Sequence, residues 1–164
     1  MSFKSGTQYA AARDWHQSCT NASGSRTDAE SNSWSFNAFW RPQESGWVPS
    51  ISAGLGKSYL SGDYRYNAPD KFASWMVGLQ WSDVFLMGND LGVAVGQPQF
   101  VAGKNNGTPD DGNYALELWY QFEVTDNISI TPGVYWLSRP WGEFTPEDKS
   151  VGVFGGLVQT TFKF

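Results

Sequence analysis

In several segments of this sequence, polar side chains alternate with apolar ones. These polar side chains are the groups with which the chain could bind or contact a solute. In residues 114–124, the polar Glu117, Gln121 and Glu123 alternate with leucines and aromatic residues. Carboxylates and amides in such a row can hydrogen-bond a passing polar solute or attract a cation. They do not make a nucleophile with its base, since the only histidine is His16 and no Gly-x-Ser-x-Gly elbow occurs. We therefore expect solute passage and no enzyme activity.

The same alternation places polar residues of other segments on a wet face. There they would line a water-filled lumen and tune its selectivity through local charge and pore width. A second interpretation stays open, in which each is a solvated lumen position with no individual role. The candidate lumen-facing residues are Asn37, Arg41, Gln80, Glu117, Gln121 and Glu123.

Metal and cofactor chemistry find little support in the sequence. Cys19 is the single cysteine, which excludes an internal disulfide framework and a cysteine-based metal cluster. Asp14, His16 and Cys19 lie close together and are ligand types that a transition metal accepts, but nothing else forms a dedicated site. We expect no metal and no cofactor. A net charge of −5 with scattered Lys and Arg argues against nucleic acid as a partner.

The elements that must position the polar rows are β-strands. The chain is aromatic and polar at once: 16% of its residues are Phe, Trp or Tyr, and only 16% are charged, against roughly 25% typically. Period-2 alternation recurs between clusters of Gly, Pro, Asn and Asp, which predicts antiparallel strands. We expect a single all-β region over 1–164, with eight strands at 3–11, 33–41, 47–57, 72–82, 91–100, 114–124, 128–138 and 151–164.

The predicted connections alternate in length. Short ones (42–46, 83–90 and 125–127) separate longer ones (12–32, 58–71, 101–113 and 139–150). Outer-membrane barrels have short periplasmic turns and longer extracellular loops, which would place the C-terminus on the periplasmic side. Acidic residues collect in the long loops and could form a cation-favouring mouth, although ordinary solvated loops would look the same. They are Asp63, Asp70, Asp110, Asp111, Glu143, Glu147 and Asp148.

A transmembrane barrel explains strands with one wet and one apolar face. In lipid every backbone group must be paired internally, so the sheet must close, and carboxylates facing a wet lumen cost little. Aromatic residues near strand ends on the apolar face predict the girdles of such barrels. They are Trp34, Trp40, Trp47, Trp75, Trp81, Tyr114 and Trp136.

The last strand carries a further sign of a barrel. Phe154, Val158, Phe162 and the terminal Phe164 share its apolar face. A final aromatic residue after apolar residues at alternate positions resembles the C-terminal signal that the outer-membrane barrel-assembly machinery reads. We therefore assign Val158, Phe162 and Phe164 to an assembly signal.

Several ordered motifs resemble cyanobacterial outer-membrane porins, a group of iron-uptake porins similar to the OprB carbohydrate-selective porins. The resemblance covers residues 33–164 and is carried by the segments 39–40, 45–54, 74–83, 95–100, 111–114, 124–132 and 154–164. It implies a cyanobacterial outer membrane as the location. It also implies passive diffusion of inorganic ions, iron among them, and of small hydrophilic solutes including sugars.

The resemblance also bears on what surrounds the chain. Full chains of that family carry a signal peptide, an S-layer-homology domain and a coiled coil before a larger barrel, and none of these three is recognisable in 1–164. We expect the C-terminal half of a barrel of about 16 strands, an eight-strand closed barrel being the other possibility. Expected partners are outer-membrane lipid, the barrel-assembly machinery, and small ions and solutes, in a homotrimer. Two other classes stay open, a soluble carbohydrate-binding β-sandwich and a small outer-membrane barrel enzyme.

Overall fold

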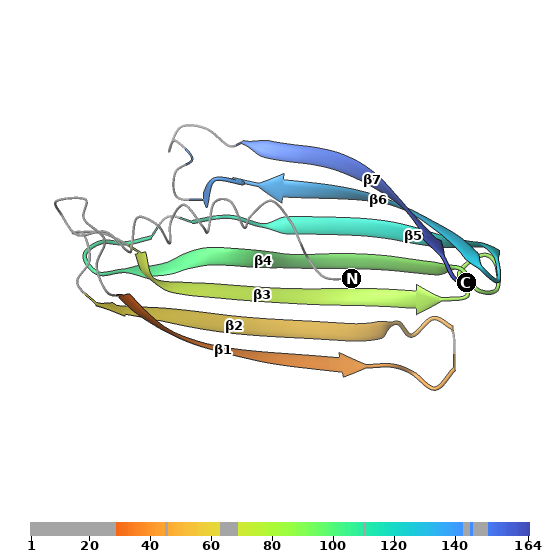
Figure 1. The fold of residues 1–164 in the computed structure, drawn as a ribbon, viewed down its shortest axis with the longest axis horizontal. Coiled ribbons are helices and arrows are strands. Elements are labelled where there is room, and N and C mark those ends of the chain that lie inside the picture. Colours follow the sequence, from red (N-terminus) through yellow and green to blue (C-terminus); the bar gives the residue numbers. More distant parts are fainter. Residues whose placement is uncertain (1–28, 45, 63–68, 110, 143–144, 146–150) are drawn as a thin grey trace.

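The computed structural model describes residues 29–44, 46–62, 69–109, 111–142, 145 and 151–164, and the regular structure in them is strand (Figure 1). All seven strands join one sheet in chain order, and each neighbouring pair is antiparallel. The all-β antiparallel fold is therefore confirmed. Among the described residues no helix is long and apolar enough to cross a membrane. The strands are β1 (Ala29–Trp40), β2 (Ser50–Gly62), β3 (Pro69–Ser82), β4 (Asp90–Lys104), β5 (Ala115–Thr125), β6 (Ile128–Ser138) and β7 (Gly152–Phe162).

Seven of the eight predicted strands are present, and the largest error in their bounds is at β2, which ends five residues later than predicted. The predicted loop at 58–71 is mostly strand, because β2 runs on to Gly62 and β3 begins at Pro69. The extra residues of β2 pair with the first residues of β1, as Tyr59 with Asn32. In these residues the backbone pairing of the strands continues, although the side chains no longer alternate between polar and apolar. The remaining predicted strand, 3–11, lies outside the described residues.

The connections gather at two ends of the sheet (Figure 1). The short-turn end holds 41–49, 83–89 and 126–127, with the C-terminus, and the long-loop end holds 63–68, 105–114 and 139–151. The predicted alternation in length is clear for β3 to β7. It fails at the first two connections, where the six residues 63–68 are fewer than the nine residues 41–49.

The strand register gives the sheet an apolar face and a polar face. One row of the apolar face crosses all seven strands through Trp40, Ile51, Leu79, Val93, Leu118, Val134 and Gly156. The adjacent row of the polar face runs through Phe39, Ser52, Gly78, Ala94, Glu117, Tyr135 and Gly155. The alternation seen in the sequence is thus kept in register from strand to strand.

The apolar face is open rather than covered. Phe36 is 61% exposed and Val158 is 71% exposed, and large apolar side chains of every strand share this exposure. A soluble β-sandwich would pack a second sheet on such a face, and the described residues form one sheet only. An apolar surface of this extent marks a contact with lipid or protein.

The buried apolar cluster of the described residues is small and lies on the other face. Leu60, Phe72 and Val101 form it near the long-loop end, and each is less than a tenth exposed. Phe72 and Val101 are register partners on β3 and β4. The polar face therefore carries an apolar patch at one end and polar side chains over its middle.

Candidate pore-lining face

The middle of the polar face is shaped like a groove. Its floor consists of the small residues Ser52, Gly78 and Ala94 on β2, β3 and β4, which are successive register partners. Larger side chains stand on both sides, Phe39 on β1 and Glu117 on β5. On one face of a sheet, the space above the backbone is filled by the side chains of that face alone. Small residues between large ones therefore leave a groove.

A hollow of about 320 Å³ occupies this groove. Its walls combine apolar, amide and carboxylate groups, the mixture that small-molecule sites use. The side chains of Ser52 and Gln80 are held within the sheet: the Ser52 hydroxyl donates to the Gly78 carbonyl at 3.4 Å, and the Gln80 amide donates to an Asp90 carboxylate oxygen at 2.8 Å. The lining residues are Asn37, Phe39, Ser50, Ser52, Ala53, Met76, Gly78, Leu79, Gln80, Ala94, Glu117 and Trp119.

Two aromatic rings of the polar face lie on glycines of the neighbouring strand. A Cβ on Gly92 would lie only 2.0 Å from Cζ2 of Trp119, its register partner, so the indole covers the Gly92 backbone. In the same way a Cβ on Gly155 would lie 2.5 Å from the ring and the hydroxyl of Tyr135. Glycine at these positions lets the rings approach the sheet closely, where any other residue would push them away.

Glu117 is the ionisable group of the groove. It lines the hollow and is half-buried, and within the described part of the chain its carboxylate has neither a hydrogen bond nor an ion pair. Glu123 differs, because its carboxylate is 4.0 Å from the Lys163 ammonium at the short-turn end. An unpaired carboxylate beside a hollow is an acceptor that remains available to a solute.

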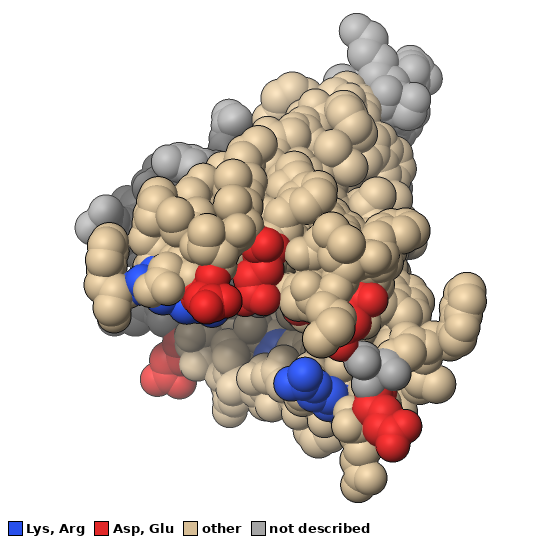
Figure 2. Space-filling view, turned by 90° about the vertical axis from the view of Figure 1, so that its right-hand side faces the viewer, with Lys and Arg blue, Asp and Glu red and all other residues tan. Residues whose placement is uncertain are grey.

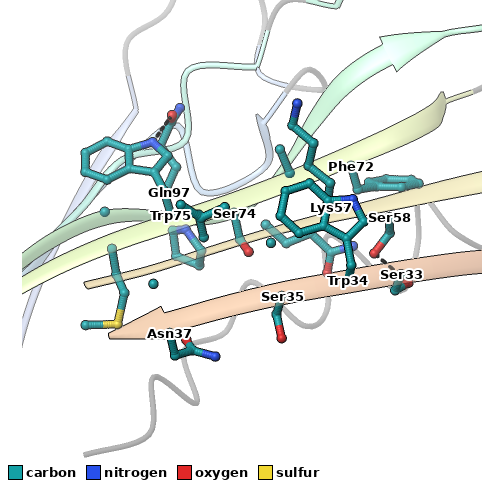
Figure 3. Close-up of a pocket in the computed structure, with 18 residues that line it drawn as sticks. Ser33, Trp34, Ser35, Asn37, Lys57, Ser58, Phe72, Ser74, Trp75 and Gln97 are labelled. Atoms are coloured by element: carbon teal, nitrogen blue, oxygen red, sulfur yellow. Dashed lines mark hydrogen bonds between the residues drawn. The ribbon is translucent and has the colours of Figure 1, made fainter. Parts of the chain in front are cut away.

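A second and larger hollow of about 510 Å³ adjoins the first (Figure 3). Its lining includes the hydroxyls of Ser33 and Ser58, which are hydrogen-bonded at 2.8 Å. In Figure 3, Ser35 and Asn37 lie on the side of β1 opposite to Trp34. Asn37 and Met76 line both hollows, so hydroxyl and amide groups continue from one hollow into the other.

The predicted lumen-facing residues fall on one face. Asn37, Gln80, Glu117, Gln121 and Glu123 belong to the polar alternation of their strands. Three of them line the 320 Å³ hollow: Asn37, Gln80 and Glu117. Arg41 lies one residue beyond the end of β1, in the connection 41–49. Their roles in selectivity stay a prediction.

Sequence reasoning did not name the aromatic residues of this face as site residues. Trp119 falls on the wet side of its predicted strand, and Phe39 is the one aromatic exception on the wet side of its own. The missing signal was Gly92, which is the register partner of Trp119. Without the register, a glycine opposite a tryptophan cannot be recognised.

Only two of the seven residues predicted to form the acidic mouth, Asp70 and Asp111, are described. The prediction that Asp70 lies in a loop is wrong. Asp70 belongs to β3 rather than to a loop, because the strand begins at Pro69. Asp111 does lie in a connection, where its carboxylate accepts the backbone N–H of Val101 at 2.8 Å and that of Asn113 at 3.3 Å. It therefore fixes the loop backbone. The other acidic candidates lie outside the described residues: Asp63, Asp110, Glu143, Glu147 and Asp148.

Charges also gather at the short-turn end, which Figure 2 views directly. Acidic and basic side chains lie beside one another there (Figure 2). They include the acidic Glu44, Asp83, Asp90, Glu123 and Asp126 and the basic Arg41 and Lys163. Acidic character is thus not confined to the long loops.

The predicted girdle residues divide between strands and connections. Trp34, Trp40, Trp75, Trp81 and Trp136 lie in strands on the apolar face. The other two, Trp47 and Tyr114, do not lie in strands.

The prediction that Trp47 lies on a strand is wrong, because it lies in the connection 41–49. Its side chain is 97% exposed. Its backbone carbonyl accepts the Trp81 indole N–H at 3.0 Å. β2 begins only at Ser50, and its pairing with β1 begins at Ile51, so Trp47 lies outside the ladder. Tyr114 directly precedes β5.

The final residues continue the apolar face beyond β7. The rings of Phe162 and Phe164 stack with centroids 6.5 Å apart. The backbone N–H of Lys163 donates to the Asn127 carbonyl at 2.8 Å, and the Asn127 amide returns a bond to the Lys163 carbonyl at 2.8 Å. The C-terminus is thus tied to the turn 126–127. Recognition of Val158, Phe162 and Phe164 by the assembly machinery stays a prediction.

Comparison with known proteins decides the family. Residues 2–164 match the family described as "Carbohydrate-selective porin, OprB family". The chain belongs to the OprB family of carbohydrate-selective porins. The resemblance drawn from the sequence motifs is thereby confirmed.

Two proteins that are similar to this chain come from cyanobacteria, and both are described as uncharacterized. A protein of Nostoc sp. (strain PCC 7120) is 31% identical over 136 residues, which cover 83% of this chain and 22% of that protein. A protein of Synechocystis sp. (strain PCC 6803) is 32% identical over 127 residues, which cover 74% of this chain and 21% of that protein. The chain thus spans about a fifth of the length of these relatives. No solved structure matches it significantly.

Proposed function

We propose that this chain forms part of the wall of an outer-membrane porin through which sugars and other small hydrophilic solutes diffuse passively. The observation that carries the proposal is the pairing of an exposed apolar face with a hollowed polar face in one sheet. Lipid suits the first face and a water-filled lumen suits the second. The OprB family supplies the expectation that the solute is a carbohydrate.

The polar face offers groups that suit sugars. Serine hydroxyls, the Asn37 and Gln80 amides and the Glu117 carboxylate can exchange hydrogen bonds with a hydroxylated solute. The family is described by carbohydrate selectivity and not by ions. Passage of inorganic ions, and of iron in particular, remains our own prediction from the sequence resemblance, with the polar face as the route.

Location and assembly belong to the same proposal. OprB porins are outer-membrane proteins, and we place this chain in a cyanobacterial outer membrane of the Gram-negative type. Outer-membrane lipid would cover the apolar face, the barrel-assembly machinery would read the final strand, and three copies would form a homotrimer. A porin function makes a channel, and not an enzyme, the expected activity.

Closure of the barrel is the structural requirement of this proposal. β1 and β7 are the edges of the described sheet, and neither outer edge is paired within it. Unpaired backbone groups cost several kcal/mol each in lipid, so both edges need a partner strand. We expect strands of a longer porin to supply them, which gives the C-terminal half of a barrel of about 16 strands.

Solute flux through the full-length protein in lipid vesicles tests the proposed function. Vesicles that contain the porin should swell when placed in isotonic glucose, because glucose enters with water. Empty vesicles serve as the control, and a trisaccharide of greater width tests the size limit. A full-length protein that inserts into the vesicles but admits no sugar would contradict the proposal.

Paired substitutions then test which face is the lumen. Gln121→Glu on the polar face should leave insertion intact and change the ion selectivity of the channel. A carboxylate at Leu118 on the apolar face should instead impair insertion. A selectivity change from Leu118→Glu without an insertion defect would reverse the assignment of the two faces.

A further inference from the structure

Two lysines lie on the apolar face, where the porin function gives them no role. Lys57 on β2 pairs with Trp34 on β1 and with Ala73 on β3, within the apolar alternation of these strands. Lys71 on β3 pairs with Tyr59, which lies two residues after Lys57 and therefore on the same face. Both lysines are exposed. A charge on a lipid-facing surface is costly unless it reaches the headgroups or an anion, so these lysines need a physical reason.

The lysines stand at one end of the apolar face rather than in its middle. The Cα atoms of Lys57 and Ile51 are separated by roughly 20 Å along β2, and Lys71 follows the start of β3 at Pro69. Both lysines thus lie toward the long-loop end. Lysine side chains near the end of a membrane-spanning segment extend to the headgroups. Outer-membrane barrels turn their longer loops outward, which assigns the two lysines to the outer leaflet.

The two lysines are diagonal neighbours on adjacent strands. Lys57 lies opposite Ala73, and Lys71 lies opposite Tyr59 in the next pair on the same face. The Cα atoms of such diagonal neighbours are roughly 7–8 Å apart, within reach of each other's side chains. Two ammonium groups at this spacing repel each other, and the repulsion grows where lipid lowers the dielectric constant. An anion between the two groups would turn this repulsion into attraction.

The surroundings of the two ammonium groups are rich in hydrogen-bond donors. The Tyr59 hydroxyl and the amide of Asn32, which lies opposite Tyr59 on β1, can both donate. Within the part of the chain that the structure describes, neither lysine has a hydrogen bond or an ion pair. Glu30 lies beyond Asn32, further toward the long-loop end, and Asp70 precedes Lys71 and so alternates to the opposite face. An anionic ligand would therefore meet donors without a competing carboxylate between them.

Trp34 marks the depth of this site. Its indole and the Lys57 side chain lie next to each other on the apolar face (Figure 3). Tryptophan prefers the headgroup level of a membrane, where the ring is in an apolar medium and its N–H is hydrated. The Lys57 ammonium beside it is thus expected at headgroup depth, with the acyl chains further along the sheet.

We infer that Lys57 and Lys71 together bind the anionic headgroup of one lipid of the outer leaflet. The inference rests on the proposed function, because it needs the apolar face to lie in lipid, and it goes beyond that function by assigning a binding site to this face. A phosphodiester headgroup offers acceptor oxygens to both ammonium groups. A soluble anion would gain these charges alone, whereas the acyl chains of a lipid also cover the next apolar row, through Leu55 and Trp75.

Lipid binding to the full-length porin in a neutral detergent tests the inference. Phosphatidylglycerol is titrated, bound lipid is counted by native mass spectrometry, and phosphatidylcholine with the same acyl chains is the comparison. Phosphatidylglycerol should bind about fivefold more tightly or better. Lys57→Gln and Lys71→Gln should each raise its half-saturating concentration about fivefold, as expected for the attraction of one lysine to an anionic lipid. Binding of phosphatidylcholine should not change.

Two further variants separate the site from general effects of charge. Lys163→Gln removes the same charge at the short-turn end, where the ammonium is 4.0 Å from the Glu123 carboxylate, and should leave phosphatidylglycerol binding within about twofold. Lys57→Arg keeps the charge and should retain most of the binding. Conductance in neutral bilayers should be unchanged in every lysine variant of the apolar face, because these side chains do not face the lumen, and it reports an intact barrel.

The outcomes distinguish the lipid site from the porin function. Equal titrations for Lys57→Gln and Lys163→Gln, or equal affinity for the two lipids, would overturn the site while the channel stands. Glycerol phosphate carries the headgroup without acyl chains, and if it displaces phosphatidylglycerol at equal concentration, the assignment to lipid is wrong. Dissociation of an oligomer by Lys57→Gln with unchanged lipid binding would reveal a subunit contact instead and also overturn the site. A full-length protein that opens no channel contradicts the proposed function, which the lipid titration does not measure.

Discussion

Two adjacent rows of residues cross the same seven strands, one on each face of the sheet, and they differ in the sizes of their side chains. On the apolar face, the row through Leu118 consists of large side chains from β1 to β6. On the polar face, the row through Glu117 drops to serine, glycine and alanine on β2 to β4 and rises again on β5 and β6. Lipid chains are fluid and need no matching shape. A solute that is to be bound needs a hollow of its own size, which the second row provides.

The largest expected difference between the faces is their tolerance of charge. Leu118→Arg should lower the stability of the full-length barrel by about 2–4 kcal/mol, because an arginine in the middle of the lipid-facing band loses its hydration. Gln121→Arg, on the polar face of the same strand, should cost less than about 1 kcal/mol. Denaturant unfolding of the vesicle-inserted protein, followed by tryptophan fluorescence, measures both. Equal losses from the two variants would mean that Leu118 does not face lipid.

A smaller difference is expected between two glycines of the polar face. A Cβ on Gly96 would lie 2.3 Å from the Trp75 carbonyl oxygen and 2.9 Å from the Met76 Cα, and these backbone atoms cannot move aside easily. Gly96→Ala should therefore cost about 1–3 kcal/mol, in the range of overpacking. The close approach lies beside the register shift between Ala73 and Trp75 on β3.

Gly133 is the matched control for Gly96. A Cβ on Gly133 would meet its nearest neighbours, the Leu118 carbonyl oxygen and the Trp119 Cβ, at 3.5 Å, which is ordinary contact. Gly133→Ala should thus stay within about 0.5 kcal/mol of the unsubstituted protein. The same unfolding measurement compares the two variants, and an equal cost would show that the space above Gly96 is not limited by backbone.

Much of this contrast was predictable from period-2 alternation. The strand at 128–138 has the bounds of β6, and the polar residues Asn37, Gln80 and Glu117 were expected on one face, where the register puts them. Alternation is a local signal that needs no knowledge of neighbouring strands. Alternation therefore predicted which face of the sheet each residue occupies. It did not predict which residues of the neighbouring strands lie beside it.

The parts that could not be predicted depend on pairing between strands. Gly92 became meaningful only as the register partner of Trp119, and Asp70 joined a strand because β3 continues in the ladder with β4 beyond the alternating residues. Trp47 lies outside the sheet because pairing of β2 with β1 begins at Ile51. Register in a meander is fixed by the whole set of neighbouring strands, which no single segment encodes.

The smallest expected effect compares two tyrosines, one on each face. The Tyr120 hydroxyl donates to the Val84 carbonyl at 2.6 Å and accepts from the Asn89 amide at 3.1 Å. Asn89 is 3% exposed, and its side-chain oxygen accepts the Glu123 backbone N–H at 2.9 Å. These bonds fasten the connection 83–89 to β5.

Tyr120→Phe should lower stability by about 1 kcal/mol, because the buried Asn89 amide loses an acceptor and the Val84 carbonyl loses a donor. The Tyr135 hydroxyl makes no hydrogen bond within the described residues, so Tyr135→Phe should leave stability within about 0.5 kcal/mol. Hydrogen exchange at the Glu123 amide gives a local readout, which should accelerate for Tyr120→Phe alone. If both variants leave this exchange rate unchanged, the Asn89 bonds hold the turn without the tyrosine hydroxyl.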